Sequence, residues 1–164
     1  MSADGVDPVV EKNFRAAMSH VAAPVSVVTT IVDGKPWGTT VSAFASLSMQ
    51  PPMLLISLQH DSGLLATVSQ GSVLGVNVLS AGQSALALAF ARKDQDRFIA
   101  LDWDLVDGAP QLRDIHAYVA VRVAQMVVGG DHVVLFCDVI DAATWETQPL
   151  TYHRRLFGSH TPEI

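Results

Sequence analysis

The sequence has one cysteine, few charges and no basic run, and each shortage excludes a class of function. Cys137 stands alone between the strand-like stretches VVLF and DVI, so it cannot form an internal disulfide and is expected to be a buried, unreactive thiol. The six histidines are scattered without an H-x-x-x-H pair, so no metal site is predicted. Ten Lys and Arg against sixteen Asp and Glu give a net charge of −6, which excludes a nucleic-acid surface.

Long apolar runs and nucleotide motifs are also missing. Runs such as SALALAF fall well below the roughly 20 residues of a membrane-spanning helix, so no membrane contact is expected. The N-terminal stretch MSADGVDPVV lacks the layout of a signal peptide, which favours a cytoplasmic protein. The sequence has neither G-x-G-x-x-G after a strand nor G-x-S-x-G, which excludes a Rossmann site and a hydrolase elbow.

What is present is an apolar chain of one domain's length. It has 164 residues, 49% of them hydrophobic and only 16% charged. We predict a single domain over residues 1–164, with a flexible N-terminus at 1–8 and a flexible tail at 159–164. So little polar surface favours a homodimer in which a second copy covers apolar area.

Hydrophobic periodicity predicts a helix followed by a strand pair. Asp7 and Pro8 are typical of a helix start, and the helix is expected to cover the end of a sheet with the apolar face of Val10, Phe14, Ala17, Met18 and Val21. Residues 25–32 then form a buried strand. Asp33-Gly34 turns the chain into a returning strand over 37–48.

The rest of the pattern is mostly that of antiparallel strands. We expect strands at 53–58 and 73–79, separated by a short helix at 63–71 that Asp61 or Ser62 caps. A second helix is expected at 81–90, where Ser80 and Gln83 form a capping box. An irregular stretch at 91–113 then leads to long strands at 116–128 and 132–145. The long strands are joined at Gly129-Gly130-Asp131. Such a sheet closes most simply into a barrel with helices at its ends.

Small hydroxyl side chains crowd the middle of this apolar pattern. They are Thr39, Thr40, Ser42, Ser46, Ser48 and Ser57. A packed core would need bulky side chains there, so a bound group is expected to fill the space. The alternative is an ordinary strand and turn with surface threonines.

The order of several short motifs resembles one known family. After GTTVSAF at 38–44 come Pro51-Pro52, MLLISL at 53–58, DSGL at 61–64, N-V-L at 77–79, F-A at 90–91 and D-R-F at 96–98. This series, spread over about residues 14–157, resembles the short-chain flavin reductases. These small oxidoreductases use FMN or FAD with NADH or NADPH.

The resemblance implies a mainly β fold with peripheral helices, a split β-barrel of the FMN-binding flavin reductase type, assembled as a homodimer. It also implies that NADH or NADPH reduces FMN or FAD, and that the reduced flavin diffuses to a flavin-dependent monooxygenase component. Two alternatives on the same fold stay open. One is a flavin storage or sensing protein without turnover, and the other is an oxidase or oxygenase with its own organic substrate.

The resemblance also implies a flavin site. Its wall comprises Thr39, Thr40, Val41, Ser42, Ala43, Ser57 and Leu58, where small side chains let backbone N–H groups reach the ring edge. Ser62 at a helix start, with Arg92 and Lys93, would hold the flavin phosphate. The R-K pair is equally typical of a solvated loop. Ala43 replaces a serine common in the family, which favours looser flavin binding.

Two further segments are candidates for the nicotinamide. In similar proteins the histidine of a G-D-H tip lies at the nicotinamide side of the flavin, which assigns His132 to holding NAD(P)H. A solvent-exposed turn residue is the alternative. Tyr152, His153 and Arg154 offer an aromatic face, a ring donor and a cation, which suit a nicotinamide or adenine and a pyrophosphate. An edge strand with a charged tail is the alternative there.

Overall fold

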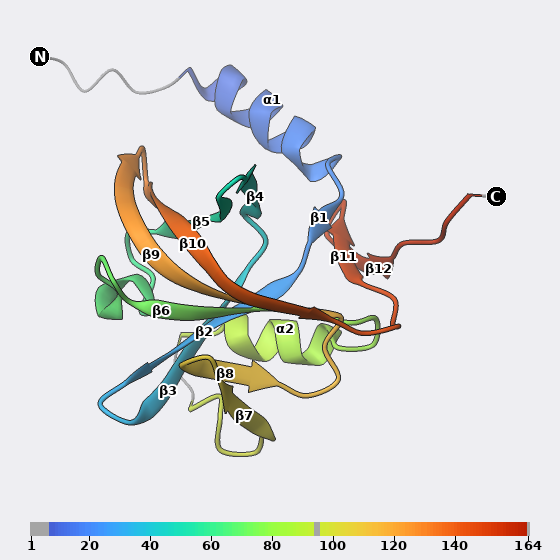
Figure 1. Ribbon diagram of the computed structural model, residues 1–164. Coiled ribbons are helices and arrows are strands. Elements are labelled where there is room, and N and C mark those ends of the chain that lie inside the picture. The colour runs from blue at the N-terminus through green and yellow to red at the C-terminus, as the bar shows by residue number, and fades with distance from the viewer. Residues whose placement is uncertain (1–6, 94–95, 164) are drawn as a thin grey trace, which may run out of the picture.

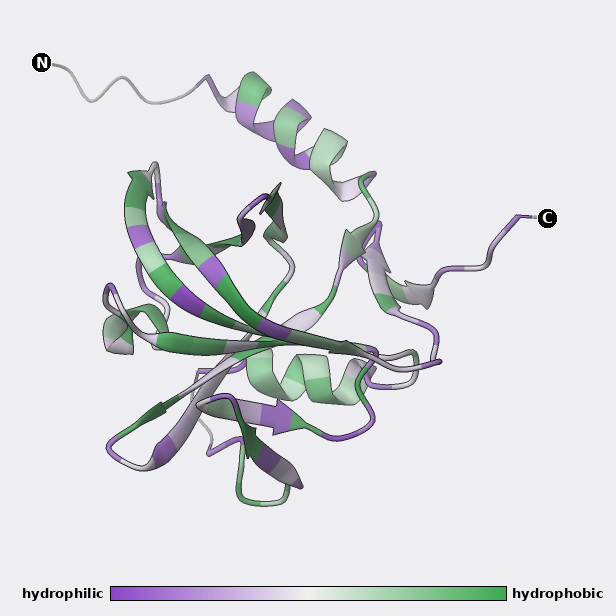
Figure 2. Ribbon diagram, in the orientation of Figure 1, coloured by the Kyte–Doolittle hydropathy of each residue, from purple (hydrophilic) through white to green (hydrophobic). Residues whose placement is uncertain are grey.

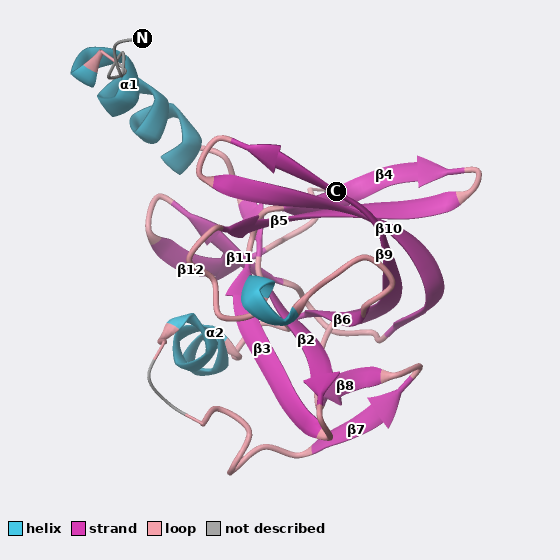
Figure 3. Cartoon of the chain, turned by 90° about the vertical axis from the view of Figure 1, so that its left-hand side faces the viewer, coloured by secondary structure: helices cyan, strands magenta, loops and turns pink. Residues whose placement is uncertain are grey.

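A computed structural model describes residues 7–93 and 96–163, and its main element is a seven-stranded antiparallel sheet. The strands are β2 (Ser26–Val32), β3 (Lys35–Val41), β4 (Phe44–Met49), β5 (Pro52–Gln59), β6 (Val73–Val78), β9 (Ala117–Gly129) and β10 (His132–Thr144). Their order in the sheet is β3-β2-β6-β9-β10-β5-β4. Figures 1 and 3 show this sheet bending strongly on itself.

The two edge strands, β3 and β4, follow each other in the sequence. β3 returns from β2 through a turn at Asp33 (φ 50°) and Gly34 (φ 75°), which confirms the predicted hairpin. The predicted single returning strand at 37–48 is wrong, because the chain leaves β2 after β3 and pairs with β5 as β4. Ala43 lies in this crossing, where its carbonyl accepts a 2.8 Å hydrogen bond from the Ser57 N–H.

Two apolar clusters flank the sheet. The first fills the inside of the bend with side chains such as Ile56, Leu74 and Leu135. The second lies between the sheet and α2 (Ser84–Ala91), where Phe90 is fully buried. α2 is apolar almost all round, as Figure 2 shows. Fully burying a side chain of this size contributes about 1.5–3 kcal/mol, so these clusters fix the position of α2 against β3.

The stretch 91–113, predicted to be irregular, contains a small hairpin of β7 (Trp103–Val106) and β8 (Ala109–Leu112). Asp107 (φ 51°) and Gly108 (φ 90°) form its turn. The buried side chain of Asn77 on β6 ties the hairpin to the sheet. It accepts a 2.8 Å hydrogen bond from the Leu112 N–H and donates one of 3.2 Å to the Pro110 carbonyl.

Helix α1 (Pro8–Ser19) begins as predicted but does not pack as predicted. The Asp7 side chain accepts a 2.8 Å hydrogen bond from the Val9 N–H, which confirms the N-cap. No residue of α1 is buried, and Phe14 is 65% exposed. Figure 1 shows the helix pointing away from the body of the chain. The expectation that α1 covers the end of a sheet is therefore wrong within one chain.

The other helical predictions need smaller corrections. The segment 63–71 contains only a 3₁₀ turn, η1 (Leu65–Thr67), which neither Asp61 nor Ser62 caps. The Ser80–Gln83 capping box is half present, because the Gln83 Oε1 accepts a 3.0 Å hydrogen bond from the Ser80 N–H while the Ser80 hydroxyl donates to the Asp114 carbonyl. In the described part of the chain, no helix is both long and apolar enough to cross a membrane.

The C-terminal segment forms a separate three-stranded sheet. It consists of β1 (Ala23–Pro24), β11 (Leu150–His153) and β12 (Leu156–Ser159). The pairing of Ala23 with Tyr152 holds it near the end of α1. The predicted flexible ends, 1–8 and 159–164, lie partly outside the described residues.

Candidate active site

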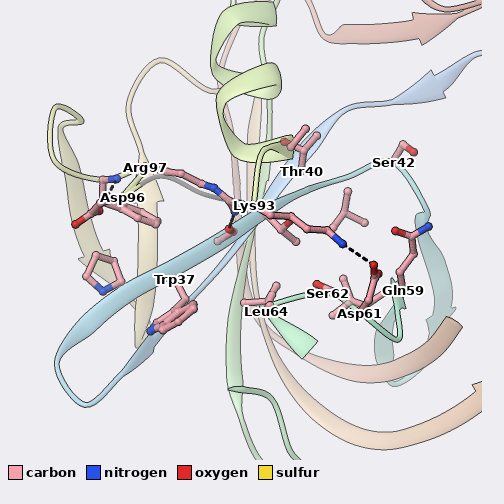
Figure 4. A pocket seen from close by; sticks show the side chains of 18 of the residues that line it. Trp37, Thr40, Ser42, Gln59, Asp61, Ser62, Leu64, Lys93, Asp96 and Arg97 are labelled. Carbon is pink, nitrogen blue, oxygen red and sulfur yellow. Dashed lines mark hydrogen bonds and ion pairs between the residues drawn. The ribbon is translucent and has the colours of Figure 1, made fainter. Parts of the chain in front are cut away.

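A cleft of about 1020 Å³ opens between β3, the end of β5 and the segment after α2. The β9–β10 tip adds His132 to its rim. Figure 4 shows side chains from all these segments except the tip facing one another across it. The cleft lies between the edge strand β3, the crossing at residues 42 and 43, and the end of β5 beyond its pairing with β4, so main-chain groups of these segments line it.

The structure brings most of the predicted site residues to this cleft. Those that line it are Thr39, Thr40, Val41, Ser42, Ala43, Ser57, Leu58, Ser62, Lys93 and His132. Ser46 and Ser48 do not line it, because they lie on β4 beyond the crossing at residues 42 and 43.

Four predicted residues do not line the cleft. Arg92 forms the C-cap of α2 and is exposed. Tyr152 and His153 belong to β11, whose pairing with β1 carries them to another part of the molecule. Arg154 lies beside α1 in a smaller cleft. In one chain, Tyr152, His153 and Arg154 therefore lie apart from the cleft, on or beside a C-terminal sheet that the sequence pattern did not reveal. Their contact with a nicotinamide or a pyrophosphate, and that of Arg92 with a phosphate, stay predictions.

The two threonines of the wall use their hydroxyls to hold α2. Thr40 donates a 2.6 Å hydrogen bond to the Ala87 carbonyl, and Thr39 donates a longer one of 3.5 Å to the Phe90 carbonyl. Gly38 permits this approach, because a Cβ there would lie 2.9 Å from the Phe90 ring. Ser42 is exposed and lines the outer part of the cleft, with its side chain on the opposite side of the strand from the Lys93–Asp61 pair (Figure 4).

Ser62 lies in the cleft wall without the predicted helix. Its carbonyl accepts a 3.2 Å hydrogen bond from the Ala66 N–H, which belongs to the 3₁₀ turn. The prediction that a helix N-terminus supplies positive charge here is therefore wrong. The Ser62 hydroxyl is buried and has no hydrogen-bond partner among the described residues. A buried polar atom of this kind costs free energy until a partner satisfies it, so it suits a ligand oxygen.

Lys93 and Asp61 form an ion pair across the cleft. The Lys93 Nζ lies 2.5 Å from the Asp61 Oδ2, and both side chains are 68% exposed. Figure 4 shows the pair beside Ser62. The ammonium group of Lys93 lowers the pKa of Asp61 through this hydrogen bond and its charge. Lys93 is thus a cation on the Ser62 side of the cleft, and a carboxylate already accompanies it.

His132 occupies the rim at the start of β10. Its Nδ1 lies 2.7 Å from the Asp131 Oδ1, and its side chain is 33% exposed. The hydrogen bond to His132 lowers the pKa of Asp131. The backbone pairing of His132 with Gln59 at the end of β5 places His132 on the same side of the cleft as Ser57 and Leu58.

Comparison with known proteins identifies the family. The model of the flavin reductase like domain matches residues 18–161. The chain belongs to the flavin reductase-like family. The reductase component of 4-nitrophenol 4-monooxygenase/4-nitrocatechol 2-monooxygenase from Rhodococcus opacus is 32% identical over 99% of this chain and 88% of its own.

Other relatives extend this result. FMN reductase (NADH) RutF of Enterobacter cloacae is 38% identical over 79% of this chain and 81% of its own. The solved structure of the NADH:FAD oxidoreductase SgcE6 of Streptomyces globisporus, in complex with NAD and FAD fragments, has a TM-score of 0.87 and 29% identity. The match covers 98% of this chain and 99% of that one. The flavin reductase-like fold of the chain is thus shown over nearly its whole length.

This flavin reductase-like chain also has lining residues that the sequence analysis missed. They include Trp37, Gln59, Asp61, Arg97, Phe98 and Trp103. Arg97 donates a 2.6 Å hydrogen bond to the Gly38 carbonyl and so joins the segment after α2 to β3. The D-R-F motif at 96–98 was the available signal for Arg97 and Phe98, whereas Trp103 reaches the cleft through a hairpin that was not predicted.

Neither the cysteine nor a metal-binding cluster is part of the cleft in the described residues. Cys137 is fully buried, and burial raises the pKa of its thiol to about 12, so it is not a nucleophile at neutral pH. Over residues 7–93 and 96–163, no group of three His, Cys, Asp or Glu side chains is arranged to hold a metal ion.

Proposed function

We propose that the protein is an NAD(P)H:flavin oxidoreductase that reduces FMN or FAD and releases the reduced flavin to a flavin-dependent monooxygenase component. The proposal is supported mainly by the cleft beside β3, in a chain of the flavin reductase-like family. In this cleft, a wall of small residues lies together with the unpaired hydroxyl of Ser62 and the ammonium group of Lys93. The cleft volume of about 1020 Å³ suits a large ligand.

The lining fits a flavin in chemical terms. Ser42 and Ala43 leave the main chain of the crossing exposed, so its polar groups are available to the edge of an isoalloxazine ring. The side chains of Val41 and Leu58 offer apolar contact to the ring face. The buried hydroxyl of Ser62 and the ammonium group of Lys93 are suited to phosphate oxygens. When bound, the flavin supplies a two-electron acceptor for the hydride of the nicotinamide.

His132 is the proposed contact for NADH or NADPH. Its ring is held by Asp131 at 2.7 Å and stands on the rim of the same cleft. Transfer of a hydride requires alignment of the two reacting rings more than an acid or base. The proposed role of His132 is therefore to bind and orient the nicotinamide. Tyr152, His153 and Arg154 do not line this cleft in one chain, so their contact with a nicotinamide or a pyrophosphate stays a prediction outside this proposal.

The proposed assembly is a homodimer of split β-barrels that acts in the cytoplasm. Support comes from exposed apolar side chains that one chain leaves uncovered. Val10, Phe14 and Met18 of α1 are each more than half exposed, as is Met49 at the end of β4. A second copy would remove this area from water.

The test is a steady-state assay of the purified protein with NADH or NADPH, each with and without added FMN or FAD. The proposal expects rapid nicotinamide oxidation that depends on added flavin, and the fastest combination identifies both cofactors. Flavin binding without nicotinamide oxidation would contradict it and support a storage or sensing protein. Nicotinamide oxidation that requires an added organic substrate as well as flavin would support an oxygenase acting on its own.

A further inference from the structure

The position of Asp61 bears on how firmly the cleft holds a phosphate. Asp61 directly precedes Ser62, whose orphaned hydroxyl is part of the proposed phosphate site. Its carboxylate lies 2.5 Å from the ammonium group of Lys93, the cation of that same site. The cation that would attract a phosphate is therefore already neutralised by a carboxylate of the chain (Figure 4).

The other cations of the lining do not change this balance. Arg97 uses its Nη1 on the Gly38 carbonyl, and Asp96 lies beside it in the sequence and also lines the cleft. Lys35 lies at the far end of the lining, next to the β2–β3 turn. At the Ser62 end, the described residues of the cleft thus offer the Lys93 cation and the Asp61 carboxylate, with the His132–Asp131 pair on the rim. A flavin phosphate bound there meets a negative charge at close range, and like charges at that distance repel.

We infer that Asp61 weakens the binding of phosphorylated flavins and so makes the flavin an exchanging substrate of this protein. The inference rests on the proposed function and deepens it. Lys93 is shared between Asp61 and the phosphate. Because both side chains of the pair are exposed, the carboxylate can move aside when the phosphate binds and return when it leaves. Each release of flavin is favoured by the ion pair that re-forms.

The first experiment compares Asp61→Asn with the wild type in flavin binding, measured by quenching of flavin fluorescence. Asp61→Asn is expected to bind FMN about tenfold more tightly, because a charge at contact distance is removed. Riboflavin, which has the same ring but no phosphate, is expected to bind both proteins equally. Its binding also reports that the variant is folded, and Asp61→Ala serves as a second variant with the same expected result.

Two controls isolate the role of the charge. Asp104→Asn removes the carboxylate of another exposed ion pair, 2.9 Å from the Arg113 guanidinium, and is expected to leave FMN affinity unchanged. Lys93→Met should weaken FMN binding. The double variant combines Asp61→Asn with Lys93→Met and is compared with Lys93→Met alone. If the carboxylate acts by competing for Lys93, adding Asp61→Asn to Lys93→Met should no longer tighten FMN binding by about tenfold. The rate of FMN dissociation, followed by displacement with excess riboflavin, should fall in Asp61→Asn alone.

Several outcomes would overturn the inference. Unchanged or weaker FMN binding in Asp61→Asn would show that the carboxylate does not oppose the phosphate. An equal gain for riboflavin would show that Asp61 acts on the ring. These results are distinguishable from failure of the proposed function, in which the wild type would bind neither FMN nor riboflavin, or would bind them without oxidising NADH or NADPH.

Discussion

The hydroxyl of Thr40 donates a 2.6 Å hydrogen bond to the main-chain carbonyl of Ala87, and so joins the cleft wall to helix α2. The sequence analysis placed Thr40 in the wall of the flavin site. Because it is engaged with the helix, Thr40 contributes to the site mainly through its backbone and through the position it gives α2. The neighbouring hydroxyl of Ser42 is exposed and available to a ligand.

Thr40→Val is expected to lower the free energy of unfolding by about 1 kcal/mol, since it removes one hydrogen bond while keeping the shape of the side chain. Flavin affinity should change by less than about twofold. Urea denaturation measures the first effect, and Thr161→Val, at an exposed position, is the matched control. A large loss of flavin affinity at unchanged stability would contradict this role.

Ser42→Ala is expected to show the reverse pattern. Loss of a hydrogen bond to the bound flavin should weaken its binding by about fivefold, which corresponds to roughly 1 kcal/mol. The urea midpoint should stay unchanged, because the side chain is exposed. The measurement is a flavin titration of Ser42→Ala, Thr40→Val and the wild type under one set of conditions. Equal flavin affinity in Ser42→Ala and the wild type would remove Ser42 from the site.

Asn77 holds the β7–β8 hairpin to the sheet. Asn77→Ala is expected to lower the free energy of unfolding by about 1–3 kcal/mol, because it leaves the buried Leu112 N–H without its partner. The Pro110 carbonyl loses one donor but keeps the 2.6 Å hydrogen bond from the Thr29 hydroxyl. Asn13→Ala in exposed α1 is the control, with an expected change below about 0.5 kcal/mol. Similar denaturation curves for Asn77→Ala and the wild type would contradict this account of the hairpin.

His132→Ala should impair the use of nicotinamide more than the binding of flavin. We expect kcat/KM for NADH or NADPH to fall about tenfold or more, since correct alignment is lost, while the flavin Kd changes by less than about twofold. His60→Ala is a matched control, because His60 neighbours the cleft without lining it. His132→Asn, which keeps an N–H donor at about the position of the His132 Nδ1, should recover part of the loss. Unchanged nicotinamide kinetics in His132→Ala would show that this role is wrong.

The thiol of Cys137 makes stability depend on alkaline pH. Burial raises its pKa from 9.0 to about 12 in the folded protein, so the unfolded chain loses its proton first. The protonated, buried thiol therefore makes its full contribution to the free energy of unfolding below pH 9. That contribution is lost between pH 9 and about 12, at up to about 1.4 kcal/mol per pH unit. The difference in unfolding free energy between the wild type and Cys137→Ala should shrink over that range. A difference that does not vary with pH would contradict the burial argument.

Much of the fold could be predicted from local patterns in the sequence. The hairpins at 33–34 and 129–131 follow from glycine-containing turns between apolar runs, and the helix start at Asp7 follows from its cap. The β7–β8 hairpin was missed although Asp107-Gly108 is the same kind of turn signal, because its strands are only four residues long. The partners of α1 could not be predicted, since an apolar face does not reveal what covers it.

The part of the candidate site that could be predicted is the part formed by residues that are consecutive in the sequence. The wall at 39–43 is one such segment, and all five of its residues line the cleft. Ser62 was chosen for a helix that is only a 3₁₀ turn, yet its hydroxyl still lies in the cleft wall. Asp61 was not chosen, because its meeting with Lys93, 32 residues away, depends on the tertiary fold. The position of Tyr152, His153 and Arg154 outside the cleft of one chain depends on the tertiary fold in the same way.

The most direct test of the account is an anaerobic titration in which FMN or FAD is present in large excess over the protein and NADH or NADPH is added in steps. The account predicts that flavin bleaching and nicotinamide oxidation proceed one to one through many flavins per chain, because each reduced flavin leaves the cleft. Bleaching that stops at one flavin per chain, or nicotinamide that is not consumed, would contradict it.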